Sequence, residues 1–399
     1  MVTRPGPGPD VIVFGQIARD LVLVVDAVPT ASRSADVYQR RELLGGKGAN
    51  QAVGLAQLGL RPALAGVVGE DQVGQRLLTQ AGQDRVDVSA VARRPGVRTA
   101  LIVDIVDATG QWRYLEDIPA GMLLTKADVI AARHLFLPGR WVSVQLQQPP
   151  AAALAAATLA HRAGGTVVLD GAPDEDCRDA LLDVADVVRA DAREAGLLAG
   201  SPLTTAAEAE KAAAELLRQG PSLVALAVED VGNLVAWPDG CVFLPLPDTP
   251  VVDTTGAGDA FVAGLITALA QDGGPQRAAR LAAAAAGATV GHPGGRPTLT
   301  PKAVQDQLTM LAESTRRQPP GLPGQAAGPV QSHVRAAVGR RTGQWLPDLP
   351  VARQHVPDRR RVGGPRPGHR AAARVRGPRG RRRHPDLRAR RRLSLPGAG

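Results

Sequence analysis

Between Val11 and about Leu311, short apolar runs alternate with longer amphipathic stretches, and this alternation restricts the fold more than any other feature. The short runs include "VIVFG", "TVVLDG" and "LVALAVED", and the longer stretches include "PPAAALAAATLAHRAG" and "AEAEKAAAELLRQG". Short apolar runs between helical stretches are typical of the strands of βαβ units. The pattern therefore predicts an α/β fold with a mainly parallel central sheet and helices on both faces.

Three early stretches depart from this alternation, because they look like strands and no helical stretch follows them. They are "LVLVVDAVP", "DVYQRREL" and "TALIVDIVDATGQWRYLE". We expect them to form a small β-sheet lid over the main sheet, built from residues of about 16–44 and 97–120. A small sheet that stands off a domain exposes strand edges, which a second copy of the chain would cover. We therefore predict a homodimer joined through residues near 21–42 and 100–116.

The net charge of +9 comes from the C-terminal part of the 399-residue chain. Residues 316–399 hold 21 of the 47 basic residues, all of them arginine, and three of the 38 acidic ones, so they carry +18 and the rest carries −9. This part is rich in Pro and Gly and lacks apolar periodicity. We predict one folded domain over residues 1–315 and a disordered tail over residues 316–399.

Two interpretations of the tail remain open. Its arginines could bind nucleic acid through phosphate contacts. Such binding would be unspecific, because the tail has no lysine and no aromatic residue after Trp345 that could stack on bases. Alternatively, the tail is the translation of an Arg-biased alternative reading frame and has no selected role.

The composition favours a soluble protein of the reducing cytoplasm. With two cysteines, Cys177 and Cys241, the chain has neither a disulfide scaffold nor a Cys-rich zinc site. No apolar run approaches the roughly 20 residues that span a bilayer. The start of the chain has too few consecutive apolar residues for a signal peptide. We therefore expect a cytoplasmic location and no membrane partner.

The stretch "VVDTTGAGDAFVAGL" at residues 251–265 places an acid at the start of a predicted helix. Apolar residues from Phe261 onward recur at helical spacing, so Asp259 should lie in the first helical turn. The glycines permit a tight turn and a close approach of a ligand to the backbone. The free N–H groups of residues 257–259 would face this ligand, and the helix dipole favours negative charge there. The motif therefore predicts an anion site that contains a carboxylate.

A second glycine cluster, "LLGGKGANQAVGLAQLG" at residues 43–59, does not match the glycine motifs of nucleotide-binding loops. It is not a P-loop, because Gly48 follows Lys47 where Ser or Thr is required, and it lacks the spacing of G-x-G-x-x-G. Its glycines offer bare backbone, and Lys47 and Asn50 project from the turn before an amphipathic helix. Together, Lys and Asn side chains can hydrogen-bond several hydroxyl groups. The cluster therefore suits a small polyol that lies against the main chain.

These two motifs resemble those of the PfkB, or ribokinase-like, carbohydrate kinase family. "GGKGANQA" resembles its N-terminal sugar-binding signature, and "DTTGAGDAF", about 200 residues later, resembles its C-terminal catalytic signature. The likeness runs from about residue 10 to about residue 311 and is closest to the ribokinases. It implies a ribokinase-like three-layer sandwich with a small β-sheet lid. It also implies phosphoryl transfer from ATP to a sugar hydroxyl, with ribose or a related pentose as the acceptor.

The resemblance also implies roles for individual residues. Asp259 would be the base that takes the hydroxyl proton, Gly256 would belong to the same catalytic turn, and the N–H groups of Ala257 and Gly258 would form an anion hole. The residues that match sugar-contacting positions are Asp20, Gly45, Gly46, Lys47, Asn50 and Gln147. Those that match the nucleotide site are Asp191, Glu229, Gly232, Gly258, Ala283 and His292. Mg²⁺ would lie near Glu194, and a K⁺ site would comprise Asp253, Thr255, Gly294 and Thr298.

Several positions depart from the family pattern. Ala18 and Asp191 stand where ribokinases usually have Asn, and Gln147 stands where they have Glu. On the nucleotide side, Glu229 ends a strand that lacks the usual Thr-x-Gly, and Ala283 replaces an expected Asn. These departures keep two alternatives open, namely a nucleoside kinase of the same fold and a sugar-binding regulator with weak or no catalysis.

Overall fold

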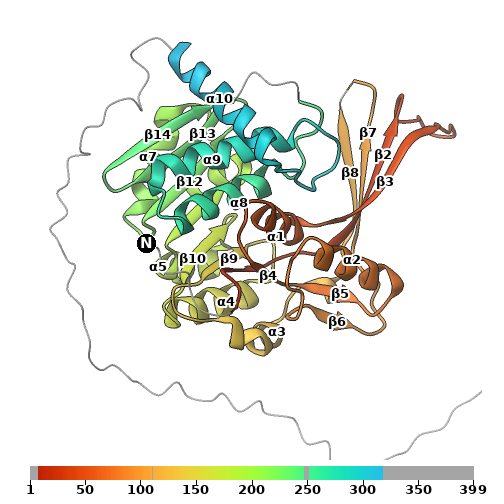
Figure 1. The fold of residues 1–399 in the computed structure, drawn as a ribbon, viewed down its shortest axis with the longest axis horizontal. Coiled ribbons are helices and arrows are strands. Elements are labelled where there is room, and N and C mark those ends of the chain that lie inside the picture. The colour runs from red at the N-terminus through yellow and green to blue at the C-terminus, as the bar shows by residue number, and fades with distance from the viewer. Residues whose placement is uncertain (1–7, 110, 247–250, 318–399) are drawn as a thin grey trace, which may run out of the picture. The chain divides into compact units, whose positions relative to one another are not determined.

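The central sheet has eight strands in the order β14-β13-β12-β11-β10-β9-β1-β4 (Figure 1), and the predicted runs "VIVFG", "TVVLDG" and "LVALAVED" form β1, β10 and β12. The strands from β12 to β4 are parallel, whereas β13 and β14 form an antiparallel hairpin at one edge. Their bounds are β1 (Val11–Phe14), β4 (Pro62–Ala65), β9 (Trp141–Gln145), β10 (Thr166–Asp170), β11 (Val187–Ala190), β12 (Leu223–Val228), β13 (Gly232–Trp237) and β14 (Gly240–Pro245). The prediction of a mainly parallel central sheet is therefore confirmed.

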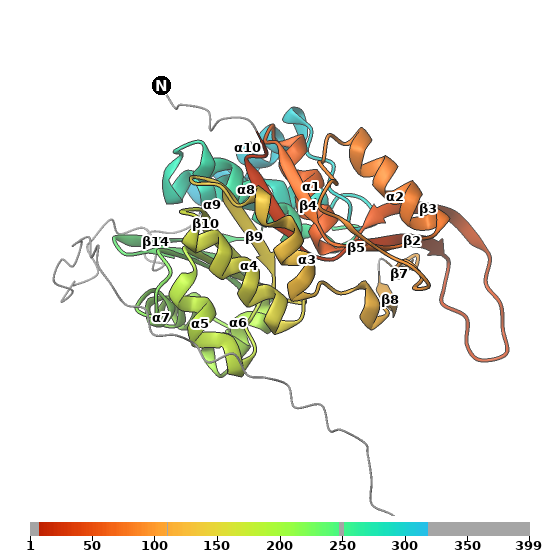
Figure 2. The ribbon, with the colours of Figure 1, turned by 90° about the horizontal axis from the view of Figure 1, so that it is seen from below.

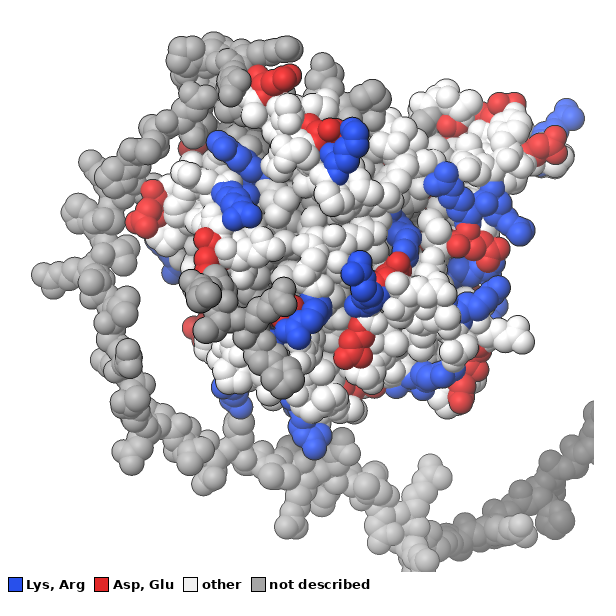
Figure 3. Space-filling view, viewed as in Figure 1, with Lys and Arg blue, Asp and Glu red and all other residues white. Residues whose placement is uncertain are grey.

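The computed structural model describes residues 8–109, 111–246 and 251–317, with side chains up to residue 313. The predicted tail of residues 316–399 lies outside the described residues except for its first two positions. On the face shown in Figure 3, basic and acidic side chains of the described part are interspersed. None of the described helices is long and apolar enough to cross a membrane.

Helices cover both faces of the main sheet because its strands are apolar on both sides. In β1, Val11 and Val13 pack into one core cluster, whereas Ile12 and Phe14 pack into another. This is the alternation expected of a strand buried between two layers. Figure 2 shows the two sets of helices on opposite sides of the sheet, so the predicted three-layer sandwich is confirmed.

The helices of one layer pack in the core cluster that contains Val11, and the helices of the other layer pack in the cluster that contains Ile12. The first layer consists of α1 (Lys47–Gln57), α2 (Gln72–Gln83), α8 (Ala257–Ala270), α9 (Gly274–Thr289) and α10 (Pro301–Arg317). The second consists of α3 (Lys126–Ala131), α4 (Pro150–Arg162), α5 (Arg178–Val184), α6 (Ala192–Ala199) and α7 (Ala206–Leu217). Small residues allow α8 and α9 to approach closely, since a Cβ at Gly264 would lie 2.7 Å from the carbonyl oxygen of Leu281.

The three strand-like stretches without helices form a separate four-stranded sheet, which stands beside the main sheet in Figure 1. Its order is β3-β2-β7-β8, with β2 (Ala18–Val25), β3 (Val37–Gly45), β7 (Leu101–Val106) and β8 (Trp112–Asp117). A further pair, β5 (Val67–Gly69) and β6 (Ala92–Arg94), forms a two-stranded sheet. The small lid sheet is therefore confirmed, whereas the homodimer through it stays a prediction.

Candidate active site

The turn before α8 brings Asp259 into the first helical turn, as the sequence predicts. Gly256 is the N-cap, with a left-handed φ of 72°. A Cβ at this position would lie 1.9 Å from the carbonyl oxygen of Gly295, so the turn packs directly on the glycine-rich loop. Glycine is required here both for its φ and for this close approach.

Asp259 is 5% exposed and is held by two amides from α1. Asn50 Nδ2 donates to Asp259 Oδ2 over 3.0 Å, and Gln51 Nε2 lies 3.4 Å from Oδ1. Burial and the charge of Asp170 raise the pKa of Asp259 to about 7, against the opposing effects of Lys47, Asn50 and Arg189. A carboxylate with such a pKa can take up a proton near neutral pH.

The start of α1 places the other predicted sugar-binding side chains next to Asp259. Gly46 is the N-cap of this helix, with a φ of 86°. A Cβ at Gly48 would lie 2.6 Å from the backbone of Gly15, so the glycine cluster packs against the end of β1. Lys47 Nζ lies 3.7 Å from Glu194 Oε1. Burial opposes the charge of Lys47, but Asp170, Glu194 and Asp259 raise its pKa.

A pocket between the main sheet and the lid contains most of the predicted catalytic and sugar-binding residues. Its lining comprises Gln16, Asp20, Val22, Gly46, Lys47, Asn50, Ile102, Asp104, Tyr114, Glu116, Gln147, Thr255, Gly256, Asp259 and Gly295. Gly45 lies behind Asp20, since a Cβ at Gly45 would lie 1.9 Å from that carboxyl group. The hydroxyl of Tyr114 on the lid contacts that of Thr255, which joins the two walls of the pocket. The sequence did not single out Asp104, Tyr114 or Glu116.

A buried polar network lies behind Asp259, and the sequence did not predict it. Gln51 Nε2 donates to Asp170 Oδ2 over 2.7 Å, and Gln51 Oε1 accepts from Ser143 Oγ over 2.8 Å. Asp170 Oδ1 pairs with Arg189 Nη1 at 2.9 Å. A Cβ at Gly258 would lie 2.5 Å from Arg189 Nη2, so this guanidinium lies against the N-terminus of α8. Asp170 and Arg189 lie at or near the carboxyl ends of adjacent parallel strands, and this position was the sequence feature that could have indicated a functional role.

The predicted magnesium residue, Glu194, belongs to a helix start. Asp191 caps α6, and Glu194 Oε2 accepts from the N–H of Asp191 over 2.9 Å. Burial raises the pKa of Glu194, and its other oxygen faces Lys47. Mg²⁺ commonly takes one or two protein carboxylates together with substrate phosphates. Glu194 does not line the pocket itself, but its contact with Lys47, which does, leaves one carboxylate near the pocket that fits this pattern.

The predicted potassium residues divide into a cluster and an outlier. Asp253 is 1% exposed; its Oδ1 accepts from the N–H and the hydroxyl of Thr255, and its Oδ2 accepts from the N–H of Gly294 over 2.7 Å. Asp253 Oδ2 keeps a lone pair for a cation, and the carbonyl oxygens of Val290 and Gly295 lie against this turn. Thr298 is exposed, and no hydrogen bond between it and this cluster is recorded for the described residues.

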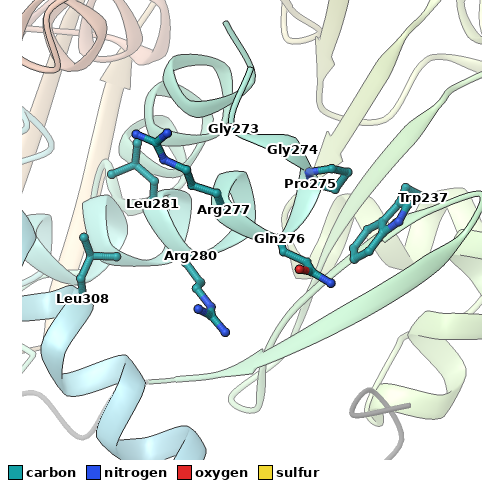
Figure 4. A pocket seen from close by; sticks show the side chains of 9 residues that line it. All are labelled: Trp237, Gly273, Gly274, Pro275, Gln276, Arg277, Arg280, Leu281 and Leu308. Atoms are coloured by element: carbon teal, nitrogen blue, oxygen red, sulfur yellow. The ribbon is translucent and has the colours of Figure 1, made fainter. Parts of the chain in front are cut away.

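None of Asp191, Glu229, Gly232, Ala283 and His292 lines this pocket, so the nucleotide site stays a prediction. Glu229 is exposed at the turn after β12, whereas Ala283 is buried in α9. A separate hollow at the start of α9 contains no predicted site residue, and its two arginines, Arg277 and Arg280, point in different directions (Figure 4).

The family model for pfkB family carbohydrate kinases matches residues 9–303, a range that contains both glycine motifs. The chain belongs to this family. The resemblance inferred from the two motifs is therefore confirmed, and the protein is a carbohydrate kinase of the PfkB type.

Curated relatives of this PfkB-family chain differ in their sugars. The chain is 28% identical to a ribokinase from Mus musculus, over 65% of this chain and 81% of the relative. It is 31% identical to a fructokinase from Klebsiella pneumoniae, over 60% of this chain and 80% of the relative. It is 32% identical to an ATP-dependent ribose-1-phosphate kinase from Halopiger xanaduensis, over 74% of this chain and 96% of the relative.

Two further likenesses concern a longer protein and a solved structure. The chain spans 63% of the length of a bifunctional ribokinase/ribose-5-phosphate isomerase A from Fructilactobacillus sanfranciscensis, at 28% identity. The structure of Arabidopsis thaliana ribokinase complexed with ribose and ATP matches 75% of this chain and 99% of its own, with a TM-score of 0.63 and 25% identity. The PfkB family and the ribokinase-like fold are thus shown, whereas the sugar is not fixed.

Proposed function

We propose that this kinase transfers a phosphoryl group from ATP to a hydroxyl of ribose or a related pentose. The observation that carries the proposal is the pocket between lid and main sheet, where the buried Asp259 lies at the N-terminus of α8 beside Asn50. Similarity to ribokinases supports ribose, and similarity to a ribokinase that was solved with ribose and ATP supports the donor.

Asp259 would accept the proton of the attacking hydroxyl, while Asn50 and Lys47 hold neighbouring hydroxyls of the sugar. Phosphoryl transfer depends mostly on positioning and on stabilisation of phosphate charge. At the start of α8, the N–H of Gly258 has no partner within the helix, whereas that of Ala257 makes a long 3.3 Å bond to the Thr254 carbonyl. Gly258 would therefore be the main donor to the transferred phosphate, with the Arg189 guanidinium adding positive charge beside it.

Two cations complete the proposed site. Mg²⁺, when bound near Glu194, would neutralise the charge of the ATP phosphates. K⁺ would be held by Asp253 and the surrounding carbonyls, and it would stiffen the contact between the α8 turn and the loop of Gly294. The described side chains alone do not form a group of three or more His, Cys, Asp or Glu residues that could hold a metal, so Mg²⁺ binding would need the nucleotide phosphates.

An ADP-release assay across pentoses, hexoses and nucleosides, with Mg²⁺ and K⁺ present, tests this proposal. We expect turnover with ribose or a close pentose. In the Asp259→Asn variant, turnover should fall by about 10²–10⁴-fold, because the amide keeps the shape and loses the basicity. Calorimetry should show that the variant still binds the sugar.

Two outcomes would refute parts of the proposal. If the Asp259→Asn variant kept more than about a tenth of the wild-type rate, Asp259 would not be the base. If the wild-type protein bound sugars but released no ADP with any acceptor, the chain would act as a sugar-binding regulator. Turnover with nucleosides alone would make it a nucleoside kinase.

A further inference from the structure

The lid side of the sugar pocket carries two buried carboxyl groups that accept too few hydrogen bonds. Asp104 on β7 is 2% exposed, and neither of its oxygens accepts a hydrogen bond from a described residue. Asp20 on β2 is 6% exposed, and its Oδ1 likewise has no partner among the described residues. Both residues line the pocket. Buried carboxyl groups in this state are costly unless something in the pocket donates to them.

The groups around Asp104 supply no positive charge. The neighbours of Asp104 are acids, because its carboxyl group contacts that of Asp253 and lies near Asp20. Burial, Asp259 and Asp253 raise the pKa of Asp20 to about 7. Tyr114 and Glu116 on β8 face the same part of the pocket, and neither carries a positive charge.

The cations near the pocket are bound to other acids. On the main domain, Lys47 lies 3.7 Å from Glu194, and Arg189 pairs with Asp170 at 2.9 Å. On the lid, Arg19 pairs with Glu42 at 2.8 Å, and Arg113 pairs with Asp107 at 3.0 Å. The described lining of the pocket is therefore divided, since its basic residue, Lys47, lies on the main domain, and its charged residues on the lid, Asp20, Asp104 and Glu116, are acids.

We propose that the substrate of this kinase carries an amino group, and that its ammonium lies between Asp104 and Asp20 while the reacting hydroxyl faces Asp259. This inference rests on the proposed function, and it names an amino sugar or an amino polyol as the substrate class. An ammonium has three N–H donors, a positive charge and no acceptor, so it matches oxygens that only accept. Hydrogen bonds between charged partners are also the stronger ones. A phosphate group in this position would face like charge.

Substrate triplets test the inference without any mutation. ADP release would be measured for ribose and its 2-amino and 3-amino deoxy analogues, and for glucose, glucosamine and N-acetylglucosamine, at one fixed KCl concentration. We expect at least one amino compound to exceed its neutral parent by about 10- to 100-fold in kcat/KM. N-acetylation, which removes the charge, should abolish the advantage.

A matched pair of variants then assigns the effect to the pocket. Asp104→Asn should lower the preference for the amino compound over its parent by about tenfold or more. Asp117→Asn changes an exposed lid acid that pairs with Arg98, and it should leave that preference unchanged. Thermal unfolding of both variants shows whether each is folded. Calorimetry of the amino compound with Asp259→Asn measures binding even where turnover is absent.

The outcomes separate the inference from the proposed function. If no sugar of either kind led to ADP release, the proposed function would fail. If neutral sugars were phosphorylated and no amino compound were preferred or bound more tightly, the inference alone would fail. In the Asp104→Asn variant, the KCl dependence of ADP release could change while the preference for amino compounds stays the same. That result would assign Asp104 to a potassium site and would also overturn the inference.

Discussion

The contact between Gly256 and Gly295 predicts that a single methyl group can disable the site. In Gly256→Ala, the new Cβ would lie 1.9 Å from the Gly295 carbonyl oxygen, whereas real Cβ atoms essentially never come closer than 3.0 Å. The turn or the loop must therefore move by about 1 Å. Because Asp259 lies three residues after Gly256, the proposed base would move with the turn. A displacement of about 1 Å in a reacting group can cost about 10²-fold in rate.

Gly274→Ala is the matched control for this change. Its φ of 70° is close to the 72° of Gly256, but no described atom beyond its chain neighbours and its own helix backbone lies within 4 Å of an added Cβ. In both variants, the left-handed backbone conformation of an L-residue should lower the free energy of unfolding by about 1–2 kcal/mol. Only Gly256→Ala adds the clash with the loop.

Steady-state ADP release and denaturant unfolding would be measured for both variants. We expect kcat to fall by about 10²-fold in Gly256→Ala and to change less than about twofold in Gly274→Ala, with both proteins destabilised. If Gly256→Ala kept more than about a tenth of the wild-type rate, the contact with Gly295 would not position the base. An equal loss of rate in both variants would trace the effect to general destabilisation.

Three further predictions concern sugar binding, pH dependence and assembly. Asn50→Ala should weaken sugar binding by roughly 1–3 kcal/mol with little change in the KM for ATP, and an unchanged sugar KM would make the glycine cluster a structural turn only. Since Asp259 must be ionised to act as a base, kcat/KM should fall as the pH drops through about 7. Asp170→Asn removes a charge that raises this pKa and leaves Arg189 unpaired, so the fall should move to lower pH; an unmoved profile would mean that another group controls it. The lid strands β3 and β8 expose Tyr38 (61%) and Leu115 (62%), so light scattering should report a homodimer that Leu115→Glu converts to a monomer. A wild-type monomer at micromolar concentration would contradict the lid interface.

The two glycine motifs could be placed from the sequence because each is local. In both, glycines precede a helix whose first turn carries the functional side chain, so the positions of Asn50 and Asp259 follow from helix geometry. That these two side chains meet, 209 positions apart, follows only from the fold. The resemblance to the PfkB family supplied that fold, and the structure shows the hydrogen bond.

The buried polar network could not be read from the sequence, because its members look ordinary alone. Gln51 resembles a solvent-facing residue of an amphipathic helix, yet it is fully buried, and its partners come from β9 and β10. The sequence pattern also did not predict strand β9. Its five residues include the polar Ser143 and Gln145, so they do not form a continuous apolar run. A buried polar side chain is tolerated when it is hydrogen-bonded, and those bonds exist only after the sheet has formed.

The division of charge across the pocket supports Asp259, among several acids, as the proposed base. Basic groups and the N-terminus of α8 lie on its main-domain side, and Asp20 and Asp104 lie on its lid side. Its pKa of about 7 reflects burial and the charge of Asp170, which outweigh Lys47, Asn50 and Arg189. A phosphate bound at α8 would add negative charge beside Asp259 and raise its affinity for a proton further. Nucleotide binding would thereby strengthen the base at the step in which the sugar hydroxyl loses its proton.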